Sequence, residues 1–167
     1  MTSKLTSQKP HGLLRWILRL PILLYRTHLG WLLGGRFVML THKGRKSGQL
    51  RRVVLEVVYR DEETGAYFVA AGWRRHADWF LNIKANPCVR VDIRRQNFSA
   101  TAEVVELIDA TATFYSYARS HPFAFQELTQ FMMGERLRSN QEDCIRLAVS
   151  VPLIRLVPIQ TATGVDL

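Results

Sequence analysis

The sequence has no aspartate or glutamate before Glu56, and it has only two cysteines. Cys88 and Cys144 stand far apart, which excludes a metal-binding cysteine motif and a disulfide framework. Arginines and Pro21 interrupt the apolar stretch of residues 13–35, so it does not offer the ~18 uncharged residues of a membrane span. A signal peptide also fits poorly, because the arginines lie inside the apolar run and no small-residue cleavage site follows. We therefore expect a cytoplasmic protein without a metal site.

Positive charge is concentrated in the first third of the chain. Of the 23 Lys and Arg residues, eleven precede Glu56, and the other twelve share the rest of the chain with all fourteen acids. A basic field of this kind attracts phosphates, nucleic acid or an anionic membrane surface. No helix-turn-helix, zinc-finger or RNA-binding signature accompanies the charge, so we do not expect nucleic acid as a partner.

Residues 11–33 have the pattern of a basic amphipathic helix, with arginines on one narrow face and large apolar residues over the rest. Two interpretations remain open. The helix lies in a membrane interface, which would place the protein at the inner face of the plasma membrane, or it packs on the following domain with its arginines in water. We divide the chain into this N-terminal basic amphipathic helical segment, residues 1–35, and one further domain, residues 36–167.

After Gly35, short apolar runs alternate with turn residues, which is typical of antiparallel strands. We expect six strands, at residues 37–41, 51–59, 66–71, 88–94, 98–107 and 152–158, with a turn at Gln96-Asn97. We expect helices at residues 76–84, 109–133 (interrupted near Pro122) and 139–149. The pattern predicts an α+β, mainly β fold: a closed or split β-barrel of about six mostly antiparallel strands with flanking helices.

The turn between the first two predicted strands reads GRKSG and spans residues 44–48. Its glycines let backbone N–H groups face a ligand, and its arginine, lysine and serine add charged and hydroxyl donors, which suits a phosphate or carboxylate. Arg51 and Arg52 follow on a strand whose side chains alternate, so only one of them can join this site. The spacing is not that of a Walker A loop. On spacing alone, a solvated basic hairpin is the alternative.

Residues 70–76, AAGWRRH, lead from a predicted strand into a predicted helix. Their small side chains permit close approach of a flat ligand, and Trp73 or Trp79 could cover a ring, although tight strand–helix packing explains the same pattern. Tyr115 and Tyr117 are the candidate catalytic proton donors, with a place in the core as their alternative. No triad, carboxylate pair or metal cluster is evident, so an enzyme of this sequence needs a cofactor for its chemistry.

Three segments in order, LTHKGRKSGQLRR, VAAGW and ADWFLNIKANPCVRVDI, resemble the deazaflavin-dependent nitroreductase family. The likeness runs from about Phe37 to Leu107, and the closing VPLIRLVP also fits. That family consists of split β-barrel oxidoreductases that use coenzyme F420 and are related in fold to flavin-dependent pyridoxamine-phosphate oxidases. The resemblance therefore implies both the barrel and the cofactor.

The resemblance also implies which residues bind the cofactor. F420 carries a phosphate and a glutamate tail, and members of the family hold the phosphate on the turn. The implied phosphate contacts are Arg45, Lys46, Ser47 and Arg51. The implied contacts of the deazaflavin ring are Val53, Val54, Leu55, Ala70, Ala71, Gly72, Trp73, Asp78 and Trp79.

The implied reaction is hydride transfer from F420H2 to an electron-poor small-molecule acceptor. Some members carry tyrosines in the late helical region where this chain has Phe123 and Phe125, and this departure favours a lipophilic acceptor such as a quinone. The alternatives are an FMN-binding oxidoreductase and a non-catalytic carrier of an anionic tricyclic or lipophilic ligand. A homodimer and contact of residues 11–33 with a membrane are further expectations.

Overall fold

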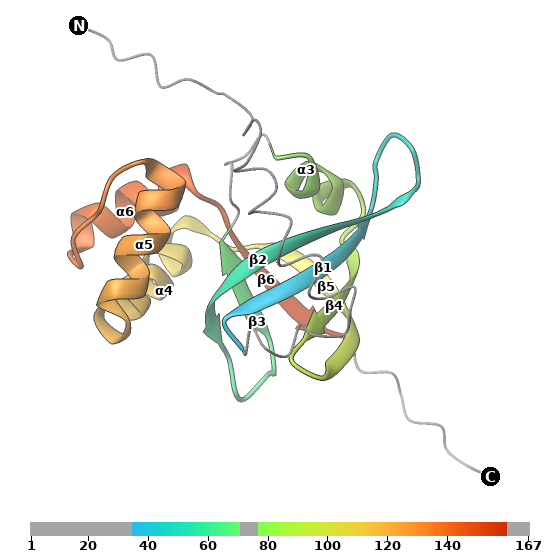
Figure 1. Ribbon diagram of the computed structural model, residues 1–167, viewed down its shortest axis with the longest axis horizontal. Coiled ribbons are helices and arrows are strands. Elements are labelled where there is room, and N and C mark those ends of the chain that lie inside the picture. The colour runs from blue at the N-terminus through green and yellow to red at the C-terminus, as the bar shows by residue number, and fades with distance from the viewer. Residues whose placement is uncertain (1–34, 71–76, 160–167) are drawn as a thin grey trace, which may run out of the picture.

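Six antiparallel strands form a closed barrel in the computed structural model, which describes residues 35–70 and 77–159 (Figure 1). The strands are β1 (Phe37–Lys43), β2 (Leu50–Arg60), β3 (Tyr67–Ala70), β4 (Cys88–Ile93), β5 (Gln96–Val104) and β6 (Leu153–Pro158). Their order around the barrel is β1-β2-β3-β6-β5-β4, and each neighbouring pair is antiparallel. The predicted fold class is confirmed.

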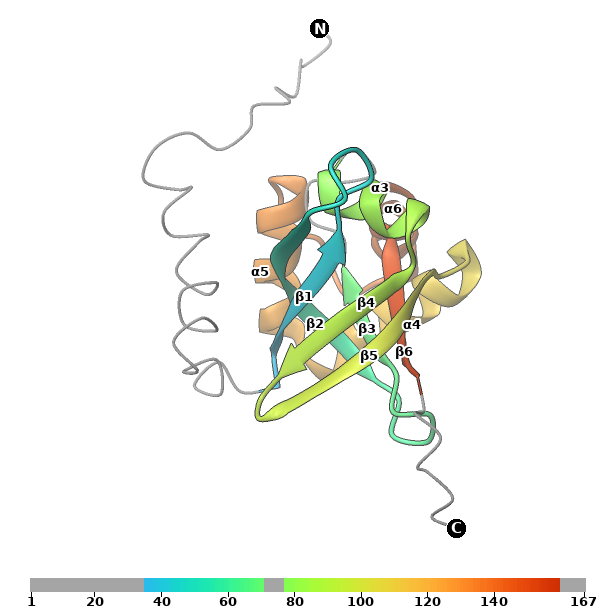
Figure 2. The same ribbon diagram turned by 90° about the vertical axis from the view of Figure 1, so that its right-hand side faces the viewer.

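Four described helices accompany the barrel: α3 (Asp78–Ala85), α4 (Leu107–Ser120), α5 (Pro122–Met133) and α6 (Gln141–Ser150). Figure 2 shows α3 at the end of the barrel beside the turn that joins β1 to β2, whereas α4, α5 and α6 gather against the side of the barrel (Figure 1). Pro122 is the first residue of α5, where its missing N–H is tolerated, and it separates α5 from α4. The side chain of Asn140 caps α6 by accepting from the Asp143 N–H at 2.8 Å.

Side chains alternate between the two faces of each strand, so the barrel has one core inside it and a second core on its outer surface. On β4, Val89, Val91 and Ile93 point inward and are at most 5% exposed, as their alternation predicts. They belong to the core inside the barrel, with residues such as Leu40, Leu55 and Ile154. The second core lies between the outer surface of the barrel and the helices, and it includes Phe114, Phe125, Leu147 and Leu153.

Two predicted boundaries are wrong in detail. Gln96 and Asn97 belong to β5, because the turn consists of Arg94 and Arg95 and is closed by the pair Ile93–Gln96, with Arg94 at a φ of +52°. Leu107 begins α4 instead of ending a strand. The predicted N-terminal helix lies outside the described residues, and its boundary with the barrel domain stays a prediction.

Candidate functional site

The turn of residues 44–49 is closed by its own backbone. The Gly44 N–H donates to the Gln49 carbonyl at 2.9 Å, and the Gly48 N–H donates to the Gly44 carbonyl at 2.8 Å. Gly48 has a φ of +67°, a conformation that glycine adopts without strain. A Cβ on Gly44 would lie 2.9 Å from the Ser47 hydroxyl, so a side chain there would disturb the turn. Both glycines of the GRKSG sequence therefore shape this turn.

Arg45 fastens the turn to α3. Its backbone N–H donates to Asn82 Oδ1 at 3.0 Å, and its Nη1 donates to the same oxygen at 2.9 Å. Its Nη2 forms an ion pair with Asp78 at 3.2 Å. Arg45, a predicted phosphate contact, and Asp78, a predicted ring contact, are thus in direct contact. The structure gives Arg45 a scaffolding role, and phosphate binding by Arg45 stays a prediction.

A buried histidine, His42, contacts the side-chain amide of Asn82. Asn82 Nδ2 lies 3.3 Å from His42 Nδ1, and both side chains are about 3% exposed. Burial lowers the pKa of His42, and the nearby Arg51 charge lowers it further, so the ring is neutral at neutral pH and its Nδ1 can accept from the amide. Sequence reasoning assigned no role to His42 or Asn82. The available signal was the i, i+4 spacing of Asp78 and Asn82, which puts both on one face of α3.

The remaining cations of the turn are open to a ligand. Lys46, Arg51 and Arg52 are exposed, and within the described part of the chain no carboxylate lies within ion-pairing distance of them. The backbone N–H groups of Lys46 and Ser47 also make no hydrogen bond to a described residue. Unpaired positive charge beside free N–H donors is the arrangement that a phosphate needs.

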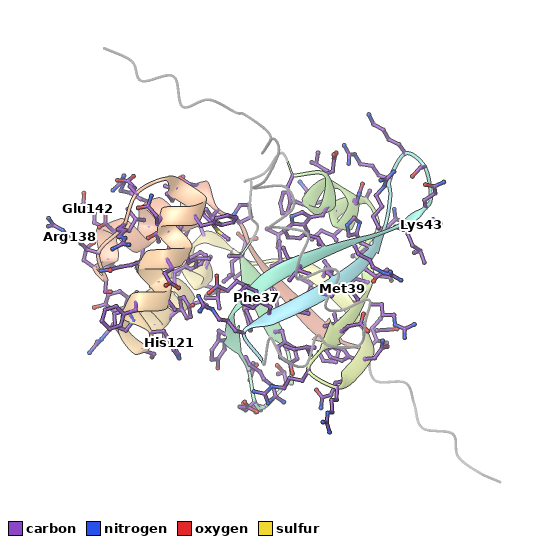
Figure 3. The ribbon with its side chains drawn as sticks, viewed as in Figure 1. Phe37, Met39, Lys43, His121, Arg138 and Glu142 are labelled. Atoms are coloured by element: carbon purple, nitrogen blue, oxygen red, sulfur yellow. The ribbon has the colours of Figure 1, made fainter. Side chains whose placement is uncertain are left out.

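The predicted ring contacts on β2 divide between its two faces. Val53 and Leu55 point into the barrel and pack in its inner core, where Leu55 is 4% exposed. Val54 lies on the outer face, half-buried, opposite Met39 of β1. Figure 3 shows Met39 midway along β1, between Lys43 at the turn and Phe37 at the end nearer α4, α5 and α6. A flat ligand on the outer face can contact Val54 of this set, and the ring-binding role of all three stays a prediction.

The other predicted ring contacts flank the part of the chain that is not described. Ala70 is fully buried at the end of β3, and Ala71, Gly72 and Trp73 lie outside the described residues. Asp78 is exposed at the start of α3. Trp79 is 7% exposed and packs edge-to-face on Phe80, with 6.2 Å between the ring centroids. The side chain of Trp79 is therefore a core residue in this structure.

The two candidate tyrosines occupy different surroundings on α4. Tyr117 is 7% exposed, and its hydroxyl donates to Glu56 Oε1 of β2 at 3.0 Å. Tyr115 is half-buried, and the Arg119 guanidinium lies 5.9 Å from its ring centroid. The structure thus brings Tyr117, but not Tyr115, into contact with a titratable group of the barrel. Glu56 was not among the predicted site residues.

A separate hollow of about 420 Å³ opens at the other end of the barrel. Its lining residues lie at or next to the β2–β3 and β4–β5 turns and at the end of β6, and Figure 2 shows these two turns at the end of the barrel away from α3. Its lining residues are Arg60, Gly65, Tyr67, Gln96, Asn97, Phe98 and Pro158. The hollow has none of the turn cations, so we assign the anion site to the turn.

Among the described residues, no three His, Cys, Asp or Glu side chains converge as metal ligands. None of the described helices has the length and hydropathy to cross a membrane.

Solved structures share this fold at low sequence identity. A pyridoxamine 5'-phosphate oxidase-related, FMN-binding protein from Nostoc punctiforme matches with a TM-score of 0.53 and 14% identity, over 92% of this chain and 82% of that one. A structure described as a domain-swapped dimer matches with a TM-score of 0.50 and 22% identity, over 81% of this chain and 98% of that one. An F420-H2 dependent reductase matches with a TM-score of 0.49 and 24% identity, over 72% of this chain and 93% of that one. The fold is that of the split-barrel, pyridoxamine-phosphate oxidase-like proteins.

Residues 22–131 match the family described as F420H(2)-dependent quinone reductase, and the chain belongs to this family. The protein is an F420-dependent reductase, and its cofactor is coenzyme F420. The expected kinship with F420-using split-barrel oxidoreductases is thereby confirmed. The described residues fit this cofactor, because Lys46, Arg51 and the free N–H groups of the turn suit its phosphate.

Proposed function

We propose that this protein reduces a lipophilic quinone with F420H2. The observation that carries the proposal is the turn of residues 44–49: α3 fixes it through Arg45, and it keeps unpaired cations for an anionic cofactor. The quinone comes from the description of the family. Phe123 and Phe125, from which the sequence favoured a lipophilic acceptor, do not support it, because Phe125 is fully buried in the second core and Phe123 is 83% exposed.

The residues of the chain divide the work of binding. Lys46, Ser47 and Arg51 hold the phosphate through charge-assisted hydrogen bonds. Arg45, Asp78 and Asn82 keep the turn in place, so that little freedom is lost when the cofactor binds. When bound, F420H2 supplies a hydride. The protein must then orient the acceptor beside it, exclude water and provide one proton.

The test is a titration of the full-length protein with F420. In Lys46→Ala/Arg51→Ala, we expect the Kd to rise about 10- to 100-fold, because two charge-assisted bonds are lost and solvent screening weakens each. Arg136→Ala/Arg138→Ala is the matched control, since it removes two exposed positive charges beyond α5. Binding is followed by tryptophan fluorescence, and turnover by the oxidation of F420H2 with a naphthoquinone.

The result separates the two parts of the proposal. Equal weakening by both double variants would mean that net charge, not the turn, holds the cofactor. Tight F420 binding without quinone reduction would reject the quinone as acceptor and leave the cofactor site intact.

Two further parts of the proposal concern assembly. A homodimer is expected because one fold relative is described as a domain-swapped dimer. Membrane contact through residues 11–33 falls outside the described residues and stays a prediction. Light scattering of the purified protein and its sedimentation with anionic vesicles test these two expectations separately.

A further inference from the structure

A second polar cluster lies on the outer face of β2, at the end away from the turn. It consists of Glu56 of β2, Arg36 just before β1, Tyr117 of α4 and Glu127 of α5. Glu56 lies on the same strand as Arg51 and Arg52, and β2 spans about 20 Å from Leu50 to Glu56 at ~3.3 Å per residue. The strand that carries the cofactor's cations therefore also carries this carboxyl group.

The carboxyl group of Glu56 is held by one of its two oxygens. Tyr117 Oη donates to Oε1 at 3.0 Å, and Arg36 Nε donates to the same oxygen at 3.2 Å. Oε2 receives no hydrogen bond from a described residue. Among the described residues, Arg155 Nε is the one side-chain polar atom that is both fully buried and without a partner. Oε2 of Glu56 also lacks a partner, so it cannot be fully buried. Glu56 is thus anchored through Oε1 and presents Oε2.

The surroundings of Glu56 have opposing effects on the pKa of its carboxyl group. Burial raises the pKa of Glu56, and the charge of Glu127 raises it further. Arg36 and the Tyr117 hydroxyl favour the carboxylate, yet the pKa of Glu56 remains above that of a free glutamate. Burial, together with Glu56 itself, raises the pKa of Tyr117, which therefore stays a phenol. The exposed ring of His121 stacks on Tyr117, with 5.4 Å between the ring centroids.

These contacts assign different roles to the phenol of Tyr117 and the carboxyl group of Glu56. A phenol with a raised pKa is a poor acid but a good hydrogen-bond donor, and Tyr117 uses its proton to hold Oε1. A carboxyl group with a raised pKa and an open oxygen suits a general acid, because efficient acids titrate near the working pH. The sequence pointed to Tyr117 as a proton donor, whereas the structure favours Glu56 and makes Tyr117 its positioning residue.

We infer that Glu56 gives the proton that completes reduction of the quinone, with Arg36 and Tyr117 as positioning residues. The inference rests on the proposed function. Reduction of a quinone to a hydroquinone takes one hydride and one proton. The hydride comes from F420H2 and leaves an oxyanion on the acceptor. Glu56 breaks its O–H bond at Oε2 and transfers the proton to that oxygen.

The charges and atoms balance over the cycle. One F420H2 and one quinone give one F420 and one hydroquinone, because the proton that Glu56 loses is replaced by the one released when the cofactor is oxidised. Between these events the Glu56 carboxylate is stabilised by Arg36 and Tyr117 through Oε1. The exposed His121 and the half-exposed Arg36 mark where water reaches the cluster.

The first readout needs no turnover. Infrared difference spectra of the full-length protein, recorded during a pH titration, should show a protonated carboxyl band that is absent in Glu56→Gln. Glu103→Gln, an exposed carboxyl of β5, is the control and should keep the band. Tyr117→Phe should raise the pH at which the band disappears, because it removes a hydrogen bond that favours the carboxylate. A Glu56 that titrates like a free glutamate would overturn the inference.

The second readout is kinetic. With F420H2 and a naphthoquinone, the wild-type kcat should fall as the pH rises through the pKa of Glu56. In Glu56→Gln, kcat should be about 100-fold lower and lose this pH dependence, since general acids contribute 10²–10⁴-fold, while F420 affinity stays at the wild-type level. Glu56→Asp keeps an acid and should keep the pH dependence at a lower rate, which decides the matter if Glu56→Gln does not fold.

The outcomes separate the inference from the proposed function. No quinone reduction by the wild type would reject the proposed acceptor, and this role of Glu56 with it. Wild-type reduction that Glu56→Gln leaves unchanged would reject the role of Glu56 alone.

Discussion

One amide side chain organises the cofactor end of the barrel. Oδ1 of Asn82 accepts from both the backbone and the side chain of Arg45, and its Nδ2 lies against His42. An amide can do both because it has an acceptor and a donor on one plane. The arrangement needs a neutral His42, since a protonated ring would turn an N–H towards the amide N–H group.

This requirement makes stability depend on pH. The pKa of His42 is lowered in the folded protein, so below about pH 6.5, the usual histidine value, the unfolded chain takes up a proton that the folded chain resists. The free energy of unfolding should therefore fall as the pH drops from about 7 to about 5. In His42→Gln, urea unfolding at the two pH values should show a smaller loss.

Glu56 contributes with the opposite sign, because its pKa is raised in the folded protein and protonation favours folding. Glu56 is present in both the wild type and His42→Gln. The difference between their pH dependences of unfolding free energy therefore reports the contribution of His42. An identical pH dependence of the two proteins would show that His42 is not held neutral.

At the scale of the element, the turn of residues 44–49 depends on backbone conformation as much as on charge. Gly48 and Gly134 both have left-handed φ values, of +67° and +77°. A Cβ at Gly48 would make only an ordinary contact with Lys43 Cε at 3.7 Å, and a Cβ at Gly134 would meet nothing within 4 Å. Alanine at either position should lower the free energy of unfolding by about 1–2 kcal/mol for the same backbone reason. Only Gly48 belongs to the turn, whereas Gly134 ends α5.

Gly48→Ala should therefore weaken F420 binding, and Gly134→Ala should not. The measurement is the F420 Kd of each variant beside its stability in urea. Equal F420 affinity of the two variants would show that the shape of the turn does not matter for the cofactor.

Elements could be predicted from the sequence because alternation and turn residues are local signals. The inward residues of β4 and the break at Pro122 follow directly from such patterns. The contacts of the site could not be predicted in the same way. Arg45 and Asn82, or Glu56 and Tyr117, are brought together by the closure of the barrel and the packing of helices on it, and neither pair has a local sequence signature. The turn was therefore predicted to be an anion site, and this stays a prediction, while its anchor and the second cluster were missed.

At the scale of the whole molecule, the net charge of +9 meets a strongly anionic cofactor. The association rate of F420 should fall as ionic strength rises, because the Debye length shrinks from ~30 Å at 0.01 M to ~8 Å at 0.15 M. An uncharged deazaflavin that lacks the phosphate and glutamates is the control, and its rate should not change. Stopped-flow fluorescence measures both, and parallel salt dependence of the two ligands would contradict electrostatic steering.

The closure of the barrel also limits how copies of the protein can associate. Each of the six described strands has a hydrogen-bonded neighbour on both sides. No described strand has a free edge along its whole length, although residues 50–56 of β2 pair with β1 alone. A second molecule therefore finds little unpaired backbone to extend among the described strands. We expect copies to associate mainly through side-chain surfaces or by exchange of a whole element, and cross-β growth from most of the described strand length to require a seam of the barrel to open.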